Sequence, residues 1–286
     1  MFLPAKKLLL DAGKRGYALG AFNTGNLEIT QAIINAAVAK KSPLIINVSE
    51  SAIEYASLGA ITSIIKSLGA EEAAKKIPMA IQVDHGKKIE RFPDYIKAGF
   101  TALMMDASRF SYEENVSLTA KTVKLAHKYK ISAQGELGAV PYKGEEEKFN
   151  AWEKAMTDPE QAKEFVRKTG VDYLAVAIGN AHGFYKERAE LDFDRLEKIS
   201  KLVKIPLVLH GASDFPDTRI KDAIARGVAL FHIDTEIRVA FSSAIKEYLG
   251  KNPAEYDPRK ILAFAREKTQ QAVEHKMEVF GSAGKA

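Results

Sequence analysis

The chain has 286 residues, of which 46% are hydrophobic and 28% charged, so it can bury a full core as one large domain or two small ones. The absence of cysteine excludes disulfides and thiolate metal sites. The net charge is +5, but Lys and Arg alternate with Asp and Glu, which argues against a nucleic-acid partner and favours attraction for small phosphorylated molecules. No apolar run approaches the roughly 18 residues of a membrane span, and the first residues lack a signal-peptide cleavage site, so we expect a cytoplasmic protein without membrane contact.

Apolar segments of strand length recur along the chain after a short helical start. They lie about 25 to 40 residues apart, and an amphipathic stretch long enough for a helix follows each one. The near-continuous apolar character of these segments is typical of strands buried on both faces of a parallel sheet. We expect eight strands, at Tyr17–Asn23, Leu44–Ser49, Met79–Asp84, Ala102–Asp106, Ile131–Leu137, Tyr173–Ile178, Leu207–His210 and Val228–Asp234.

Eight strand–helix alternations in about 250 residues predict an α/β fold of the (β/α)8 TIM-barrel type. Because no linker, repeat or composition shift divides the chain, we expect a single domain over residues 1–286 with additional C-terminal helices. A doubly wound open sheet is the alternative, but no Gly-x-Gly-x-x-Gly turn follows any predicted strand.

Two segments interrupt the regular alternation. Residues 139–149, after the fifth strand, are polar and contain Gly and Pro, so we interpret them as a mobile lid over the active face. Residues 252–259 separate two helical stretches. The second of these, from about Arg259 to Val279, is expected to pack on the outside of the barrel or against another subunit.

Polar residues gather where the predicted strands end, and the C-terminal ends of barrel strands carry the catalytic groups in this architecture. A single histidine in such a place is usually a hydrogen-bonded core residue, whereas several around one rim with carboxylates beside them indicate a site. The residues concerned are Asn23, Ser49, Asp84, His85, Asp106, Glu136, His182, His210, His232, Asp234 and Thr235.

Three of the six histidines, His85, His182 and His210, are each followed by glycine and each close an apolar run. Three neutral imidazoles with an open fourth position form a typical catalytic zinc site. The glycines remove side chains where a substrate would approach the backbone. His127 and His275, by contrast, lie in Lys/Glu-rich helical stretches and are expected on solvated faces.

The chain resembles class II, metal-dependent fructose-bisphosphate aldolases of the shorter bacterial type over nearly its whole length. Several long motifs in the family's order carry the resemblance. They lie at residues 21–23 (AFN), 48–50 (VSE), 84–86 (DHG), 99–101 (GFT), 136–138 (ELG), 175–183 (AVAIGNAHG), 210–213 (HGAS), 234–236 (DTE) and 257–260 (DPRK).

The resemblance implies reversible cleavage of fructose 1,6-bisphosphate into dihydroxyacetone phosphate and glyceraldehyde 3-phosphate. One catalytic Zn²⁺ per subunit would bind to His85, His182 and His210 and stabilise the enediolate. Another divalent metal is an alternative to zinc. A monovalent cation would be a further cofactor. No lysine ends a predicted strand, which argues against a Schiff-base route.

The resemblance also assigns acid–base roles. Asp84 would take the proton of the C4 hydroxyl, with orientation of a metal ligand as the alternative role. Asp106 and Glu136 would serve as alternative ligands or as supporting groups. The acid that protonates C3 would lie among Glu145, Glu146 and Glu147, unless these three form only a solvated face.

Substrate contacts follow from the same resemblance. One phosphate would lie on the loops after strands six to eight, at Gly183, Lys186, Gly211, Ser213, Asp234 and Thr235, with Asp234 directed at a hydroxyl. Asn23, Ser49 and His232 would also contact the substrate. Arg259 would reach the second phosphate, in a neighbouring subunit of a homodimer or homotetramer, unless it is a surface residue at a helix start.

The chain departs from the family pattern on this rim, most clearly at His232, where Asn is usual. The histidine could change specificity, offer a fourth imidazole or reduce turnover. Other departures lie at Ser51, Ala107, Arg109, Gly135, Ala212 and Asp214. The alternatives are therefore an aldolase for tagatose 1,6-bisphosphate or another ketose 1-phosphate, a metal-dependent sugar-phosphate epimerase, and a non-catalytic sugar-phosphate-binding relative; Asp234 favours fructose over tagatose.

Overall fold

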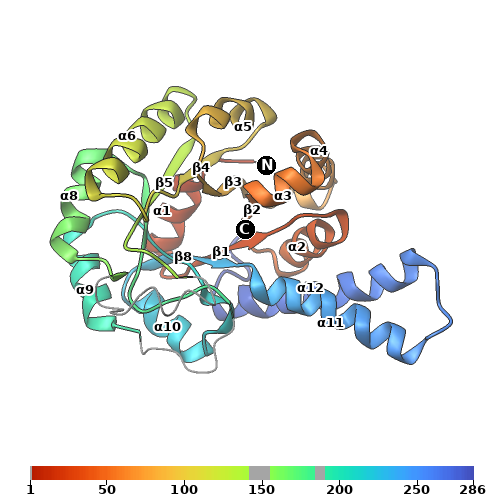
Figure 1. Ribbon diagram of the computed structural model, residues 1–286. Helices are drawn as coiled ribbons and strands as arrows, with labels where there is room; N and C mark the ends of the chain where they lie inside the picture. Colours follow the sequence, from red (N-terminus) through yellow and green to blue (C-terminus); the bar gives the residue numbers. More distant parts are fainter. Residues whose placement is uncertain (1, 142–154, 184–190) are drawn as a thin grey trace.

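A computed structural model describes residues 2–141, 155–183 and 191–286, and in it eight parallel strands close into a barrel in chain order (Figure 1). All eight predicted strands are confirmed, with ends that differ by at most two residues. They are β1 Leu19–Asn23, β2 Leu44–Ser49, β3 Met79–Gly86, β4 Ala102–Met105, β5 Ser132–Leu137, β6 Tyr173–Val176, β7 Leu207–Leu209 and β8 Val228–Ile233.

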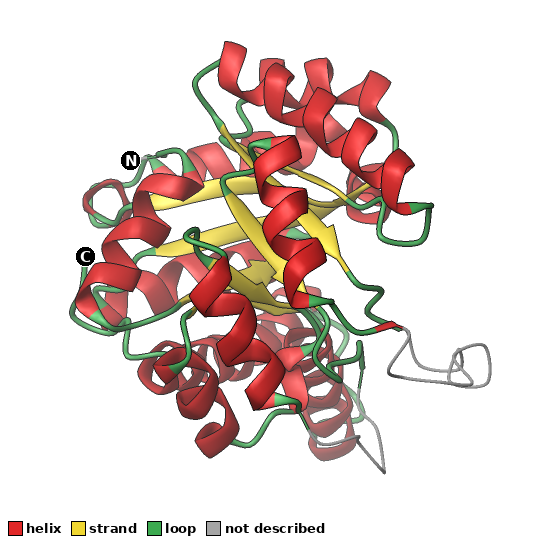
Figure 2. Ribbon diagram, turned by 90° about the vertical axis from the view of Figure 1, so that its left-hand side faces the viewer, coloured by secondary structure: helices red, strands yellow, loops and turns green. Residues whose placement is uncertain are grey.

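Helices cover the outside of the barrel (Figure 2). Many begin at a residue whose side chain accepts the first free N–H groups, as Asn26, Asp158 and Asp192 do, and Ser111 forms a complete capping box with Glu114. The α-helices are α1 Ala5–Arg15, α2 Leu27–Lys40, α3 Glu50–Ala56, α4 Leu58–Gly69, α5 Phe92–Ala98, α6 Tyr112–Lys128, α8 Pro159–Thr169, α9 Phe193–Leu202, α10 Asp217–Ala225, α11 Thr235–Lys251 and α12 Pro258–Val279; short 3₁₀ turns lie at Ala74–Lys76 (η1), Ile89–Arg91 (η2) and Ala212–Asp214 (η4).

The side chains of the strands form two separate apolar cores. Outward-facing residues such as Val83 and Phe231 pack against the helices. Inward-facing residues such as Leu19 and Ala80 pack with Leu8 and Leu9 of α1, which therefore closes the N-terminal mouth of the barrel.

The barrel interior becomes polar toward the C-terminal ends of the strands. Strand register places Asn47 of β2 beside Gln82 of β3, and Gln134 of β5 beside Tyr173 of β6, and all four side chains are buried. Because side chains alternate along a strand, residues two positions further on face the same interior and form the mouth. A polar layer thus separates the apolar base of the barrel from the site above it.

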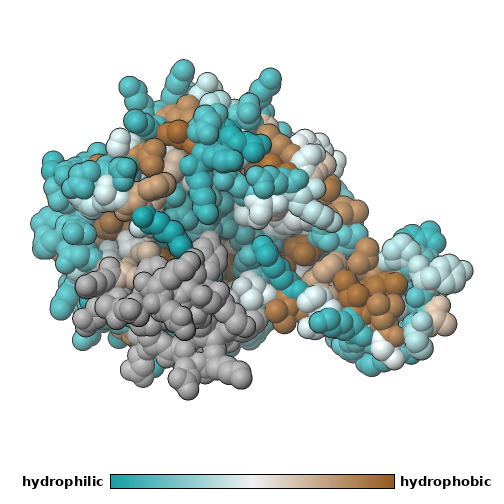
Figure 3. All heavy atoms as spheres, viewed as in Figure 1, coloured by the Kyte–Doolittle hydropathy of each residue, from teal (hydrophilic) through white to brown (hydrophobic). Residues whose placement is uncertain are grey.

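Helices α11 and α12 form an arm that projects from the barrel (Figure 1). They confirm the predicted break around residues 252–257, and apolar side chains gather on the arm's surface (Figure 3). The other end of α12 is anchored, because Phe280, which follows it, stacks on Phe231 of β8 with ring centroids 5.0 Å apart. Lys276 also forms a 3.0 Å ion pair with Glu236 of α11.

Most of the expected lid, residues 142–149, lies outside the described residues. Within the described part of the chain, no helix is both long and apolar enough to cross a bilayer.

Phe280 tests whether the C-terminal helix belongs to the barrel domain. Its side chain is 1% exposed, so Phe280→Ala should lower the free energy of unfolding by about 3–5 kcal/mol while leaving a single denaturation transition. The control is Phe110→Ala, because Phe110 is 57% exposed and its loss should change that free energy by less than about 0.5 kcal/mol. Denaturant titration followed by circular dichroism measures both; a small effect at Phe280 would mean that α12 packs independently of the barrel.

Candidate metal centre

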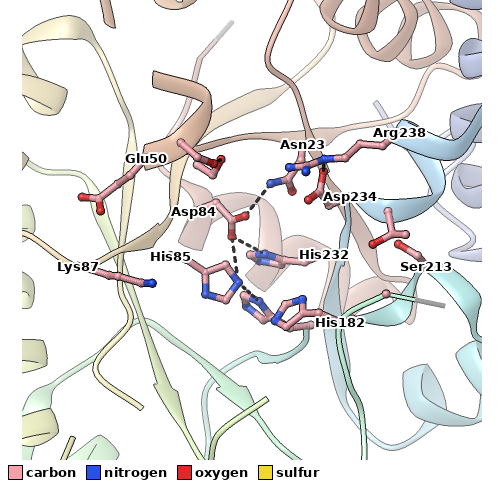
Figure 4. Close-up of a pocket in the computed structure, with 16 residues that line it drawn as sticks. Asn23, Glu50, Asp84, His85, Lys87, His182, Ser213, His232, Asp234 and Arg238 are labelled. Carbon is pink, nitrogen blue, oxygen red and sulfur yellow. Dashed lines mark hydrogen bonds and ion pairs between the residues drawn. The ribbon is translucent and has the colours of Figure 1, made fainter. Parts of the chain in front are cut away.

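A cavity of about 470 Å³ opens at the C-terminal mouth of the barrel (Figure 4). Twelve of the residues predicted from sequence line it, and they come from the ends of β1, β2, β3 and β8 and from the loops after β6 and β7. These twelve are Asn23, Ser49, Asp84, His85, His182, Gly183, His210, Gly211, Ser213, His232, Asp234 and Thr235.

Three imidazoles converge at one side of this cavity. One nitrogen from each of His85, His182 and His210 lies within 4.8 Å of the other two. Nδ1 of His210 is 3.1 Å from Nε2 of His85, close to the spacing of about 3.3 Å between two ligands of a tetrahedral zinc ion with Zn–N bonds near 2.0 Å. The donor set therefore fits a zinc ion, as the sequence predicts.

The backbone at His85 lets two consecutive residues face the same cavity. In a regular strand Asp84 and His85 would point to opposite faces. His85 instead has φ of 49°, a left-handed conformation, and the register between β3 and β4 shifts between Val83 and Gly86. The next residue in the chain, Gly86, has to be glycine because a Cβ there would lie 2.7 Å from the carbonyl oxygen of Met104. Packing against the protein itself, rather than substrate access alone, requires glycine at this position.

Asp106 orients His85 for a ligand role. Its Oδ2 lies 2.7 Å from Nδ1 of His85, and Ser108 donates to its Oδ1 at 2.9 Å. This leaves Nε2 of His85 facing His210 and agrees with the supporting role predicted for Asp106. Glu136 is buried beside this pair, and its Oε2 has no hydrogen-bond partner among the described residues. The carboxylates of Asp106 and Glu136, with His85, offer a second set of potential metal ligands.

Burial and neighbouring charges shift the pKa values of His182 and His85 in opposite directions. Burial lowers the pKa of His182 to about 3, helped by the neighbouring His85, so His182 is a neutral imidazole. Burial would also lower the pKa of His85, but Asp84 and Asp106 outweigh it and raise that pKa to about 10. A cation bound here would therefore displace a proton from His85.

The pKa values of the carboxylates near His85 are also shifted in opposite directions. Burial raises the pKa of Glu136 to about 8, and the negative charge of Asp106 adds to the effect. For Asp106 the hydrogen bond to His85 overcomes burial and lowers the pKa to about 2. Asp84 is likewise held below its ordinary pKa against the effect of burial, by the charge of His85 and the hydrogen bond from His232. Asp84 and Asp106 are therefore ionised at neutral pH.

Both oxygens of Asp84 accept hydrogen bonds from buried side chains (Figure 4). Nδ2 of Asn23 donates to Oδ2 at 2.7 Å, and Nδ1 of His232 lies 3.0 Å from Oδ1. The ring of His232 also stacks on that of His210, with centroids 3.8 Å apart. His232 therefore lies against both the expected base and a potential metal ligand.

A buried polar network beneath the histidines was not predicted from the sequence. Gln134 lies 2.8 Å from Nε2 of His210, Gln82 donates to Gln134 at 3.0 Å, and the hydroxyl of Tyr173 donates to Gln82. The signal was available, because Asn47, Gln82 and Gln134 each precede a predicted site residue by two positions. In strands with period-two alternation this spacing places both members of a pair on the same face.

The opposite side of the cavity carries the expected phosphate loops. Gly211 has φ of 65°, and a Cβ there would lie 2.1 Å from the carbonyl oxygen of Ala181, so the loops after β6 and β7 touch at this glycine. Asn180 ties the same loops by donating to the carbonyl of His210 at 3.1 Å. Ser213 faces the cavity from η4.

Asp234 accepts a 2.7 Å hydrogen bond from Arg238, one turn later in α11, which also lines the cavity. Ser51, named from the sequence as a departure from the family pattern on this rim, also lines the cavity; Arg238, Glu50 and Lys87 complete the lining and were not predicted. They are sequence neighbours of predicted residues, or one helical turn away, so proximity to the motifs would have identified them.

Lys87 corrects one sequence argument. No lysine ends a strand predicted from the sequence, but Lys87 directly follows β3 and lines the cavity. Its side chain is exposed, whereas lysines that form Schiff bases are typically desolvated or next to another cation. The exposure of Lys87, rather than the absence of a lysine, therefore argues against Schiff-base chemistry.

Arg259 does not line the cavity. Arg259 lies at the start of α12, where its exposed guanidinium pairs with Asp257 at 2.9 Å. Lys186, Glu145, Glu146 and Glu147 lie outside the described residues. Both helical histidines are about half exposed, as expected: His127 lies 3.0 Å from the buried Asp172, and His275 lies 3.4 Å from Asp217.

Known proteins resemble the chain over its whole length. The family model described as fructose-bisphosphate aldolase class-II matches residues 4–285. A probable fructose-bisphosphate aldolase from Bacillus subtilis is 43% identical over 98% of each chain, and the fructose-bisphosphate aldolase of Thermus caldophilus is 40% identical over the full length of both. The crystal structure of the YdjI aldolase from Escherichia coli K12 matches with a TM-score of 0.87 and 34% identity over all of both chains.

The resemblance seen in the motifs is thus confirmed by the whole chain, and the metal-ligating groups at the barrel mouth agree with a metal-dependent enzyme of this kind. The chain belongs to the class II fructose-bisphosphate aldolase family, whose members are carbon–carbon lyases.

Proposed function

We propose that the protein is a zinc-dependent aldolase that reversibly cleaves fructose 1,6-bisphosphate into dihydroxyacetone phosphate and glyceraldehyde 3-phosphate. The observation that carries the proposal is the convergence of three imidazole nitrogens within 4.8 Å, next to an ionised aspartate in a cavity open at one end. His85, His182 and His210 would hold the ion. When bound, a divalent cation supplies a Lewis acid for the substrate ketone and for the negative charge of the enediolate.

Asp84 would act as the base. Its carboxylate takes the proton from the C4 hydroxyl, the C4 oxygen becomes the aldehyde oxygen, and the electron pair of the C3–C4 bond remains on the three-carbon ketone fragment. The lowered pKa of Asp84 keeps it ionised and ready to accept this proton at neutral pH. Protonation of C3 then needs an acid, for which Glu145, Glu146 and Glu147 remain the predicted residues.

The two ends of the substrate would lie on opposite sides of the cavity. Gly183, Gly211 and Ser213 would hold the phosphate next to the ketone, together with Lys186 and Thr235. The distal carbons would extend past Asp234 toward Asn23 and Ser49, where a second cavity of about 330 Å³ shares these residues with the first.

We further propose that the protein is a homodimer or homotetramer that uses the α11–α12 arm. Val239, Leu249 and Tyr256 on this arm are 43%, 37% and 90% exposed, so a second copy could cover them. Arg259 lies on the same arm and would reach the distal phosphate of a neighbouring subunit. The cytoplasmic location remains a prediction from the sequence.

Removal of the metal tests the central claim. The protein stripped by a chelator should release no triose phosphate from fructose 1,6-bisphosphate, and added Zn²⁺ should restore cleavage. His182→Ala should lose at least about 100-fold in kcat/KM and bind less zinc. His275→Ala is the matched control, because this histidine is half exposed, lies 3.4 Å from Asp217 and does not line the cavity. A coupled triose-phosphate assay measures each; full activity of the stripped protein would contradict the proposal.

Replacement of the proposed base should separate chemistry from metal binding. Asp84→Asn keeps the size of the side chain but removes the proton acceptor, so kcat should fall by about 10²–10⁴. Zinc content, measured by atomic emission, should remain at the wild-type value because Asp84 is not one of the three ligands. Unchanged kcat would show that another group takes the C4 proton.

Mixed oligomers test the role of Arg259. Arg259→Ala should raise KM for the bisphosphate by about tenfold, the effect of losing one charge-assisted contact of about 1.4 kcal/mol. Co-expression with the Asp84→Asn variant should restore activity, since some sites then combine an intact Asp84 with an intact Arg259 from the other chain. Light scattering gives the oligomeric state, and a lack of restoration would place Arg259 outside the neighbour's site.

A further inference from the structure

We infer that His232 is a positioning residue, which holds the Asp84 carboxylate in the orientation needed for proton transfer and neither binds the substrate nor ligates the metal. The inference rests on the proposed function, because it concerns the residue that acts as the base. It depends on three features of His232, which are its hydrogen bonds, its ring packing and its burial.

The hydrogen bonds of His232 fix its tautomer. The amide nitrogen of Gln82, a donor, lies 3.4 Å from Nε2 of His232, so Nε2 is the acceptor of the ring. Nδ1 therefore carries the ring proton and donates it to Oδ1 of Asp84 across 3.0 Å. Gln82 keeps this orientation because Tyr173 donates to its oxygen. Both polar atoms of the ring are therefore engaged within the protein.

The ring is held in place from the other sides as well. It is 5% exposed and stacks on His210, with an interplanar angle of 29°. Nδ2 of Asn47 packs 3.0 Å from its Nδ1 without a hydrogen bond to that protonated nitrogen, and donates instead to Oδ1 of Asn23 at 3.3 Å. Rotation of His232 toward a substrate or a metal would break its bond to Asp84 and leave buried polar atoms without partners.

Two hydrogen-bond donors from different strands thus hold the Asp84 carboxylate in one orientation. Asn23 of β1 donates to one oxygen of Asp84 and His232 of β8 to the other, while Asp84 itself comes from β3. A carboxylate rotates easily about its last bond, and a displacement of about 1 Å at a reacting group costs on the order of 10²-fold in rate. Loss of the His232 donor would leave the hydrogen bond from Asn23 and the longer 4.0 Å contact with Nε2 of His85, so the carboxylate would be held less firmly.

Three variants separate the possible roles of His232. Asn places an N–H where Nδ1 lies, Gln places its amide near Nε2, and Phe keeps the ring without a donor. His232→Phe and His232→Gln should lower kcat by about 10–100-fold with KM for fructose 1,6-bisphosphate within about twofold of wild type, and His232→Asn should return kcat to within about threefold. Zinc content should be unchanged in all three. The Gln variant keeps the test valid if the Phe variant does not fold.

Other outcomes would overturn the inference. A raised KM with unchanged kcat in all three variants would make His232 a substrate ligand, and a loss of zinc would make it a metal ligand. If His232→Asn were as slow as His232→Phe, an N–H at the position of Nδ1 would not be sufficient, and the inference that His232 acts through this hydrogen bond to Asp84 would be wrong. In the Asp84→Asn background, His232→Gln should have no further effect, because the residue acts through Asp84; an additive loss would show an independent role.

A spectroscopic measurement does not depend on activity. Long-range ¹H–¹⁵N correlation spectra of the metal-free protein should show that Nδ1 of His232 is the protonated ring nitrogen, and protonation at Nε2 would overturn the inference. Wild-type protein that does not cleave fructose 1,6-bisphosphate would refute the proposed function instead. In that case the same spectrum still decides whether His232 holds Asp84.

Discussion

His85 lies between two buried carboxylates, and the rest of the site is arranged around this balance of charge. Asp106 contacts one ring nitrogen, and Asp84 lies 4.0 Å from the other. A charge is costly to bury unless it is paired, so the positive imidazolium and the two carboxylates stabilise one another. A divalent cation at the same point would meet the same two negative groups. The side chains of the protein therefore provide electrostatic surroundings that suit a cation at this point.

The geometry of the barrel makes this arrangement possible. Parallel strands present their carboxyl ends at one mouth, and the inward side chains of each strand alternate with those that pack against helices. At His85 the chain leaves this rule, through its left-handed backbone and the shifted register of β3. Strain of this kind persists where the surrounding structure over-determines it, and here the tight packing of Gly86 against Met104 and Phe92 does so.

The sequence predicts the fold and most of the residues that line the cavity. It fails where the contacts are between residues that are distant in the sequence. The eight apolar runs indicated the strands because buried parallel strands need continuous apolar residues, and the His–Gly pairs marked three histidines that converge at the cavity because they end these runs. The contact of His232 with Asp84 joins residues 148 positions apart and has no local signal. Gln82 and Gln134 were missed because isolated amides inside apolar runs do not look like a site. Lys87 was missed because the strand extends two residues beyond the predicted end.

The glycine at position 211 has a consequence for how this enzyme can diversify. Because the loops after β6 and β7 interlock there with no room for a single methyl group, a change in one loop forces a change in the other. The half of the mouth formed by Ser51, Lys87 and Arg238 is exposed and has no such constraint. New substrate preferences should therefore arise by single substitutions on that half, whereas the loops after β6 and β7 should change only together.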